Sequence, residues 1–347
     1  MEKKINYNDL YEIKFISNIT NIKYKKELIK DSYSLTRIDN TFITFTSIDK
    51  CTYIIYSIEN NNSIIVFDFN KEKIINTIEN AHNTYVMSFR YNFNKKYNKE
   101  YIVSVSKDRN IKLWEFPNFL CITSIEKAHR ASYIFSLCIL PFKDNDYILS
   151  SSGSDEEKIR VWDFKGNKVR EINDSKERTG FMDVYYSQKY NISYVIIGNY
   201  GNIKSFNFDI DELYKTYYDK AEEKNDHTNF IIYENDSFEI ILIDSCLDGY
   251  IRLWDFHSSD LINKIKCSRY NYSLRNICLS KDKKFLFTVC SNENSIKIID
   301  LNQKKVITCI KVKTNELISI KSIENQLYGS CILLKGILKD YIQLWST

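Results

Sequence analysis

One short phrase returns along this chain with its tryptophan in a fixed place, and this recurrence constrains the fold more than any other feature. The phrase reads IKLWEF, IRVWDF, IRLWDF and IQLWST, and it holds all four tryptophans, Trp114, Trp162, Trp254 and Trp345. Their spacings are 48, 92 and 91 residues. Because the two long spacings are close to twice the short one, a copy without tryptophan is expected midway in each. Self-similarity at such a period indicates a repeat architecture.

The expected copies are present, with another large apolar residue in the tryptophan slot. IKSFNF places Phe206 there, IKIID places Ile299, and IIVFDF, upstream of the first tryptophan, places Phe67. The slot therefore recurs at 67, 114, 162, 206, 254, 299 and 345, in steps of 44 to 48 residues. Seven copies on one period predict seven equivalent structural units.

Each unit reads as a set of short β-strands. Apolar and polar side chains alternate in IKLW, as in a half-buried strand, and similar runs surround it: TYVMSFRY (84–91), EYIVSVS (100–106) and LCITSI (120–125). Four short strands in each period are typical of one propeller blade. We therefore expect an all-β, seven-bladed propeller that takes up residues 1–347 as a single domain.

On these residues the chain resembles the WD40-repeat β-propeller family, and the resemblance covers nearly all of it. In such blades a His before the first strand, a Ser or Thr on the second, an Asp in the next turn and a Trp on the third form a hydrogen-bonded network. The resemblance implies this structural network in three copies, with one further tryptophan in the last: His82, Ser104, Asp108, Trp114; His129, Ser151, Asp155, Trp162; His227, Asp248, Trp254; and Trp345. Because the set recurs at the repeat period beside a buried Trp, we interpret it as structural and not as a catalytic triad.

Two departures from the family pattern affect the blades. The Gly that precedes the family's His is Ala81, Ala128 and Asp226 here, and copies one, four, six and seven lack the His. Those four blades are expected to depend on apolar packing between neighbouring sheets. The last copy ends two residues after its tryptophan, whereas YEIKFIS (11–17) reads as a strand without a blade. Since an open ring would expose two long edges, we expect residues 11–17 to form the outer strand of the seventh blade.

The composition argues against several classes of function. The chain has no apolar segment of membrane-spanning length, which predicts no membrane insertion and a cytoplasmic location, with the nucleus as the alternative. Nine cysteines without a CxxC pair favour reduced thiols over disulfides or a zinc site. Without a phosphate-binding glycine motif or a histidine cluster, neither a cofactor nor a metal is expected. A net charge of +4 with short, dispersed basic clusters does not favour nucleic acid as a partner.

The resemblance implies a non-catalytic protein–protein interaction scaffold within a larger complex. One alternative is a substrate receptor of a cullin-type ubiquitin ligase, since residues 162–165, WDFK, resemble the WDxR sequence of such receptors with Lys in place of Arg. A less favoured alternative is a propeller hydrolase, which would gather acidic or histidine side chains at the central channel.

The resemblance also implies where partners would dock. In the family, the loops just after the His and before the turn Asp lie together on one face around the channel. Here those loops, and the link into the sixth blade, carry a set of aromatic and basic residues: Tyr85, Lys107, Arg109, Arg130, Tyr133, Arg269, Tyr270 and Tyr272. Tyr and Arg often anchor interfaces. Several cations together favour a protein or peptide partner with an acidic or phosphorylated segment.

Overall fold

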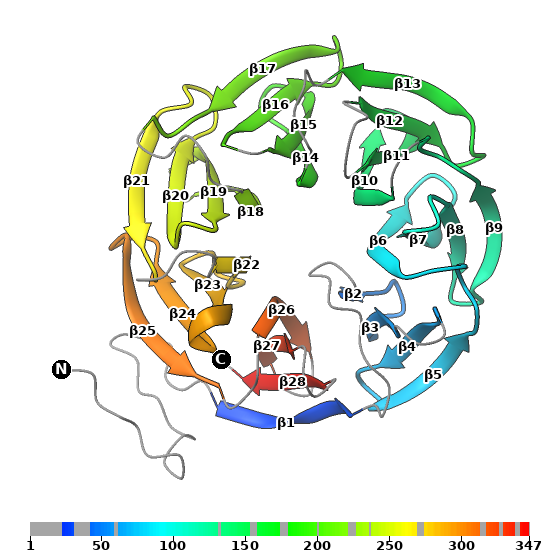
Figure 1. Cartoon of the computed structure of the whole chain (residues 1–347), viewed down its shortest axis with the longest axis horizontal. Coiled ribbons are helices and arrows are strands. Elements are labelled where there is room, and N and C mark those ends of the chain that lie inside the picture. Colours follow the sequence, from blue (N-terminus) through cyan, green and yellow to red (C-terminus); the bar gives the residue numbers. More distant parts are fainter. Residues whose placement is uncertain are drawn as a thin grey trace.

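The computed structural model describes residues 23–30, 42–58, 62–130, 133–152, 158–173, 180–199, 201–220, 227–235, 237–268, 274–312, 317–325, 329–336 and 341–346. In these ranges the strands form seven four-stranded antiparallel sheets, arranged as blades of a ring (Figure 1). The prediction of an all-β propeller is confirmed. One 3₁₀ turn, Ser291–Glu293, is the sole helical element of the described ranges, and no helix there has the length and apolar character needed to cross a membrane.

In six blades the four strands follow one another in sequence, from the channel outward. Blades one to three consist of β2 (Phe42–Thr46), β3 (Thr52–Ser57), β4 (Ile64–Asp68), β5 (Lys73–Ile78); β6 (Val86–Asn94), β7 (Lys99–Ser106), β8 (Ile111–Phe116), β9 (Leu120–Ile125); and β10 (Ile134–Phe142), β11 (Asn145–Ser152), β12 (Lys158–Asp163), β13 (Lys168–Asn173). Blades four to six consist of β14 (Phe181–Ser187), β15 (Ile192–Gly198), β16 (Ile203–Asn207), β17 (Glu212–Tyr217); β18 (His227–Glu234), β19 (Ile240–Cys246), β20 (Tyr250–Asp255), β21 (Leu261–Lys266); and β22 (Leu274–Leu279), β23 (Phe285–Cys290), β24 (Ser295–Asp300), β25 (Lys305–Lys311).

The seventh blade is closed by an N-terminal strand, but not by the segment predicted from the sequence. It contains β26 (Leu317–Asn325), β27 (Gly329–Gly336) and β28 (Tyr341–Ser346), and β1 (Lys23–Lys30) pairs antiparallel with β28 on the outside. The expectation that residues 11–17 fill this position is wrong, and those residues lie outside the described part of the chain. An outer strand needs few apolar side chains, so KYKKELIK can fill it although its charges make it a weak strand by pattern.

The repeated tryptophan slot marks the same structural position in every blade. All seven slot residues lie on the third strand of their sheet. In the first six blades the pairing of the third with the fourth strand shifts register directly before the slot residue, at these positions: Phe67, Trp114, Trp162, Phe206, Trp254 and Ile299. Such bulges bend a strand and increase its twist. The slot therefore coincides with the point where each outer strand turns away from its blade.

The hydrophobic core lies between neighbouring blades. Trp114 packs into a layer that blade two shares with blade one, together with Val66 and Ile102. Phe206 and Ile299 occupy the corresponding layers toward blades three and five. Each of these slot residues therefore seals the interface with the preceding blade, including in blades four and six, which lack the histidine. Burial of such side chains contributes about 1.5–3 kcal/mol each.

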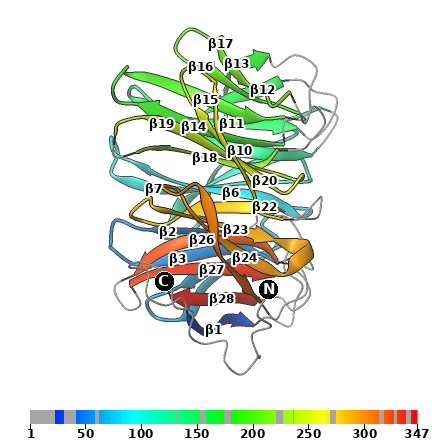
Figure 2. The ribbon, with the colours of Figure 1, turned by 90° about the vertical axis from the view of Figure 1, so that its left-hand side faces the viewer.

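The alternation of strand directions gives the ring two different faces. We call the linker face the one that carries the links between blades and the turns from second to third strands. The hairpin face carries the turns from first to second and from third to fourth strands. Seen from its edge, the ring has strands that run from one face to the other (Figure 2). Equivalent turns of all blades therefore gather on the same face.

Turn geometry explains how a chain with eight glycines forms so many tight turns. Asn62, Asn80, Asn98, Asn191 and Asn294 adopt the left-handed backbone region that glycine usually fills, as expected from their side chains. Lysines share this role at corresponding positions: Lys50, Lys127, Lys143, Lys283 and Lys304. Lysine is therefore part of the turn framework and not only a solvated charge.

Candidate functional site

Blade two contains the complete hydrogen-bonded network implied by the sequence. Trp114 Nε1 donates a hydrogen bond to Ser104 Oγ at 2.9 Å, and Ser104 Oγ lies 2.8 Å from His82 Nε2. On the other side of the imidazole, His82 Nδ1 lies 3.2 Å from Asp108 Oδ2. The link between blades, the second strand, the next turn and the third strand are thus joined through one imidazole.

The direction of donation through this network follows from the first bond. Because the indole N–H already donates to Ser104, the serine hydroxyl can donate to His82 Nε2, which leaves Nδ1–H for Asp108. Burial lowers the pKa of His82 although Asp108 opposes this, so the imidazole is neutral at pH 7. Burial by itself would raise the pKa of Asp108, but hydrogen bonds from His82 and from backbone amides hold it at about 2. A neutral His with both ring nitrogens engaged is suited to stabilising a turn, not to proton transfer.

Blade three repeats the arrangement but uses the neighbouring serine. Trp162 Nε1 donates to Ser150 Oγ at 3.0 Å, and His129 Nε2 lies 2.9 Å from the same oxygen. The sequence-based assignment of Ser151 is therefore wrong. In the pairing of the second with the third strand, Ser150 faces Arg160 just as Ser104 faces Lys112, and successive side chains on a strand point to opposite faces. Asp155 lies outside the described residues.

Adjacent serines on one strand provide a direct test of this assignment. Ser150→Ala is expected to lower the free energy of unfolding by about 1–3 kcal/mol, because it leaves Trp162 and His129 without their shared partner. Ser151→Ala is the matched control. Its buried hydroxyl has no hydrogen-bond partner among the described residues, so its removal should cost little. Denaturant titration measures both, and equal losses would contradict the assignment.

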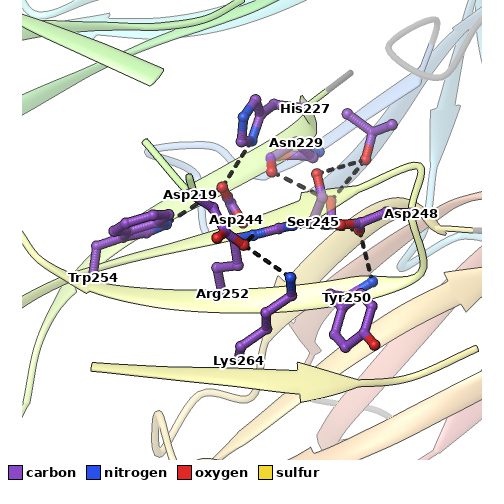
Figure 3. A network of polar contacts seen from close by, with 11 residues as sticks. Asp219, His227, Asn229, Asp244, Ser245, Asp248, Tyr250, Arg252, Trp254 and Lys264 are labelled. Carbon is purple, nitrogen blue, oxygen red and sulfur yellow. Dashed lines mark hydrogen bonds and ion pairs between the residues drawn. The ribbon is translucent and has the colours of Figure 1, made fainter. Parts of the chain in front are cut away.

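Blade five builds its network on a carboxylate in the serine position (Figure 3). By register, Asp244 on β19 occupies the place that Ser104 has in blade two. His227 Nδ1 lies 2.8 Å from Asp244 Oδ2, and Trp254 Nε1 donates to that oxygen at 3.4 Å. Asp244 is fully buried, so its charge requires a cation nearby.

Arg252 supplies that cation from the third strand. Its guanidinium is 1% exposed, donates to Asp219 from Nε at 2.9 Å and forms an ion pair with Asp248. Lys264 Nζ also donates to Asp219, at 2.9 Å. Burial opposes the charge of the Arg252 guanidinium, but Asp244 and Asp248 raise the pKa of Arg252 above its usual range. The prediction that Asp248 would act as the turn aspartate for a His is therefore corrected: it pairs with Arg252, and His227 pairs with Asp244.

The sequence reading missed a basic residue two positions before each of three tryptophans. In blade two Lys112 Nζ donates to the carbonyl of Ala81 at 2.6 Å, and in blade three Arg160 donates to the carbonyl of Ala128. These carbonyls belong to the residues that replace the family's glycine before the His. Arg252 stands at the same place in blade five. The sequence signal was the Lys or Arg in IKLW, IRVW and IRLW, which stands between two apolar residues of the third strand.

Four of the predicted partner-binding residues meet on the linker face at the junction of blades two and three. Tyr85 is 39% exposed, and Lys107 Nζ lies 5.8 Å from the centroid of its ring. Two residues further along the same turn, Arg109 donates from Nη1 to the carbonyl of Arg130 at 2.8 Å. This arrangement holds the turn of blade two against the link into blade three, and the Lys107 and Arg130 side chains are exposed.

The remaining predicted partner-binding residues have different positions. Tyr133 is half-buried and packs beside Phe135, with the ring centroids 6.3 Å apart, so part of it belongs to the core. Arg269, Tyr270 and Tyr272 lie outside the described residues, and the Trp345 side chain is not among those described, although its backbone lies on β28. In the described ranges no group of three His, Cys, Asp or Glu side chains is arranged to hold a metal ion.

A ring of four-stranded sheets with a Trp–Ser–His–Asp network in its second blade is the arrangement that the resemblance to WD40-repeat propellers implied. Residues 72–115 and 120–163 match the family model described as WD domain, G-beta repeat. These segments run from the outer strand of one blade to the third strand of the next, β5 to β8 and β9 to β12. The recognition of a WD40-repeat β-propeller is thereby confirmed. No curated protein matches the sequence significantly.

Proposed function

We propose that this chain is a non-catalytic scaffold that presents its linker face to protein or peptide partners in a larger complex. WD40 propellers are typical protein-interaction scaffolds and generally lack catalytic activity. The observation that carries the proposal is the cluster at the junction of blades two and three, Tyr85, Lys107, Arg109 and Arg130. A rigid blade framework supports this cluster, and preorganised surfaces lose little entropy on binding.

The chemistry of this cluster favours an acidic or phosphorylated segment as the ligand. Lys107 and Arg109 come from the turn between β7 and β8, and Arg130 comes from the link into blade three. A hydrogen bond from Arg109 to the backbone carbonyl of Arg130 positions the Arg109 guanidinium. The carboxylate of Asp108, which lies between Lys107 and Arg109 in the chain, is buried and accepts hydrogen bonds from His82 and two backbone amides. This carboxylate is therefore engaged within the turn, and the Lys107 and Arg109 side chains can offer charge-assisted hydrogen bonds to a carboxylate or phosphate.

We further propose a cytoplasmic location, with the nucleus as the alternative. The cysteines of the described strands support a reducing compartment. Cys138, Cys246, Cys278 and Cys290 are buried thiols outside any disulfide, and burial raises the pKa of each, which keeps them protonated and unreactive. Imaging of the tagged full-length protein in its native cell tests the location.

A two-residue change on the linker face tests the scaffold proposal. Arg130→Glu with Tyr85→Ala is expected to reduce recovery of the main partners at least tenfold in affinity purification followed by mass spectrometry, since hot-spot residues at interfaces contribute about 2 kcal/mol or more. Both side chains are exposed, so the melting temperature should not change. Tyr133 is left intact because it packs in the core.

A matched variant on the outer side of blade five serves as the control. Lys266→Glu with Ile262→Ala reverses one charge and truncates one apolar side chain on β21, where both residues are exposed. It should recover partners at wild-type yield. If the linker-face variant also recovers the full set, this face is not where the partners dock.

A further inference from the structure

The turns between first and second strands form a ring on the hairpin face, opposite the proposed protein-docking surface. Six of these turns include described residues, one in each of blades one to six. Each contains one non-glycine residue in the left-handed backbone region, listed in blade order: Lys50, Asn98, Lys143, Asn191, Phe238 and Lys283. The shared geometry means that the tips project in equivalent ways around the channel.

Four of these tips expose a large apolar side chain. Ile48 is 52% exposed, Tyr97 62%, Tyr190 46% and Phe238 77%. Single exposed apolar side chains are common on protein surfaces, but here an exposed apolar side chain recurs at the equivalent turn of four blades, all on one face. Ile210, in a turn from third to fourth strand on the same face, is also exposed. The hairpin face therefore has several separate apolar contact points around its ring and no single patch.

Lysines surround these apolar tips. Blade two contributes Lys95, Lys96 and Lys99, blade six contributes Lys281, Lys283 and Lys284, and blades one, three and four add one each, Lys50, Lys143 and Lys189; all are exposed. Against these nine stand five exposed carboxylates among the described residues of the same turns and strand ends: Asp49, Asp144, Glu234, Glu239 and Asp282. Because Lys99 also forms an ion pair with Glu115, the ring has an excess of three positive charges, supplied by lysine alone.

The lysines and the aromatic tips are paired in space. Lys96 Nζ lies 5.7 Å from the centroid of Tyr97, and Lys189 Nζ lies 5.2 Å from that of Tyr190. Lys143 Nζ lies 4.8 Å from the ring of Phe142 in blade three. Each such tip thus offers an apolar body beside an ammonium group, the combination that sits well at the boundary between lipid headgroups and acyl chains.

We propose that the hairpin face docks on an anionic lipid surface, with the apolar tips entering the headgroup layer and the lysines facing lipid phosphates and carboxylates. A flat anionic surface can contact all the tips at once, so several weak contacts add. A protein partner is less well matched, because protein interfaces are depleted in lysine and gather their apolar residues at one buried centre. Outer turns of the same face differ in charge: blade four carries Asp209, Asp211 and Glu212, whereas blades one, three and six add exposed lysines, Lys71, Lys165 and Lys304. The inference does not depend on the proposed linker-face function.

Vesicle co-sedimentation of the full-length protein tests the proposal. The protein should bind vesicles of phosphatidylcholine with about one third phosphatidylserine at least tenfold more tightly than vesicles of phosphatidylcholine alone, and high salt should weaken binding. Lys95→Ser, Lys96→Ser and Tyr97→Ser together should reduce binding roughly tenfold or more. Phe238→Asn, which keeps a residue tolerant of the left-handed backbone, should weaken binding without changing its salt dependence.

The matched control removes the same residue types from the linker face. Lys107→Ser, Lys127→Asn and Tyr85→Ser should leave vesicle binding at the wild-type level, while all variants keep the wild-type melting temperature, since asparagine tolerates the left-handed backbone of Lys127. The proposal is overturned if wild-type protein does not distinguish the two vesicle types, or if hairpin-face and linker-face variants behave alike. Loss of a protein from affinity purification in the hairpin-face variants alone, without vesicle binding, would assign the face to a protein partner and also overturn it.

Discussion

Arg252→Ala is expected to lower the free energy of unfolding by about 3–5 kcal/mol, the usual cost of removing one partner from a buried charge network. The guanidinium is fully enclosed and contacts Asp219 and Asp248 directly, while Asp244 lies within its field. Without the guanidinium, the three carboxylates would share only the Lys264 ammonium and the His227 imidazole. Denaturant titration at neutral pH measures the loss.

Two further variants separate charge from volume. Arg252→Met keeps most of the side-chain volume and should lose nearly as much stability, because unpaired charge and not a cavity dominates the cost. Arg130→Ala removes an exposed arginine and should stay within about 0.5 kcal/mol of wild type. If Arg252→Met were as stable as wild type, the carboxylates would not depend on this cation.

Deletion of residues 1–30 is expected to lower the melting temperature by about 5–10 °C. This change removes β1 and leaves β28 with an unpaired edge along the register from Lys23↔Ser346 to Lys30↔Tyr341. The lost hydrogen bonds contribute about 1 kcal/mol each, and about 1 kcal/mol corresponds to roughly 1–2 °C in a chain of this length. Because the ring shares one closure, the loss should affect the whole transition, which differential scanning calorimetry measures.

A shorter deletion distinguishes the observed closing strand from the one first expected. Removal of residues 1–18 takes away 11–17 but leaves Lys23–Lys30 in place, so the ring should stay closed and the melting temperature should fall much less. Equal effects of the two deletions would contradict β1 as the closing strand.

The network of blade three illustrates how far local sequence reaches. Trp162 was placed by the period of the repeat, which is a property of the chain alone, and His129 by the family resemblance. Ser150 and Ser151 fit the spacing equally well, and the choice between them depends on which one shares a sheet face with the tryptophan. A single-residue change in register reverses that choice, so pattern by itself could not settle it.

Blade five shows the same limit for charges. Asp244 and Asp248 lie four residues apart, and either could have been the partner of His227 by position in the sequence. The strand pairing places Asp244 opposite Arg252 and beneath the tryptophan, while the turn directs Asp248 to the guanidinium. Long-range pairing between side chains from different elements decided the partners.

The sequence by itself determined the repeating unit of this protein: a strand period, a slot for a large apolar residue and a histidine in three linkers, because these depend on neighbours a few residues apart. The tertiary structure alone decided which strand closes the ring, which serine or aspartate meets each histidine, and which turn tips share the hairpin face. Phe238 and Tyr97 are more than a hundred residues apart in the chain. Only the closure of the ring brings such residues onto one surface, since closure places every equivalent turn on the same side.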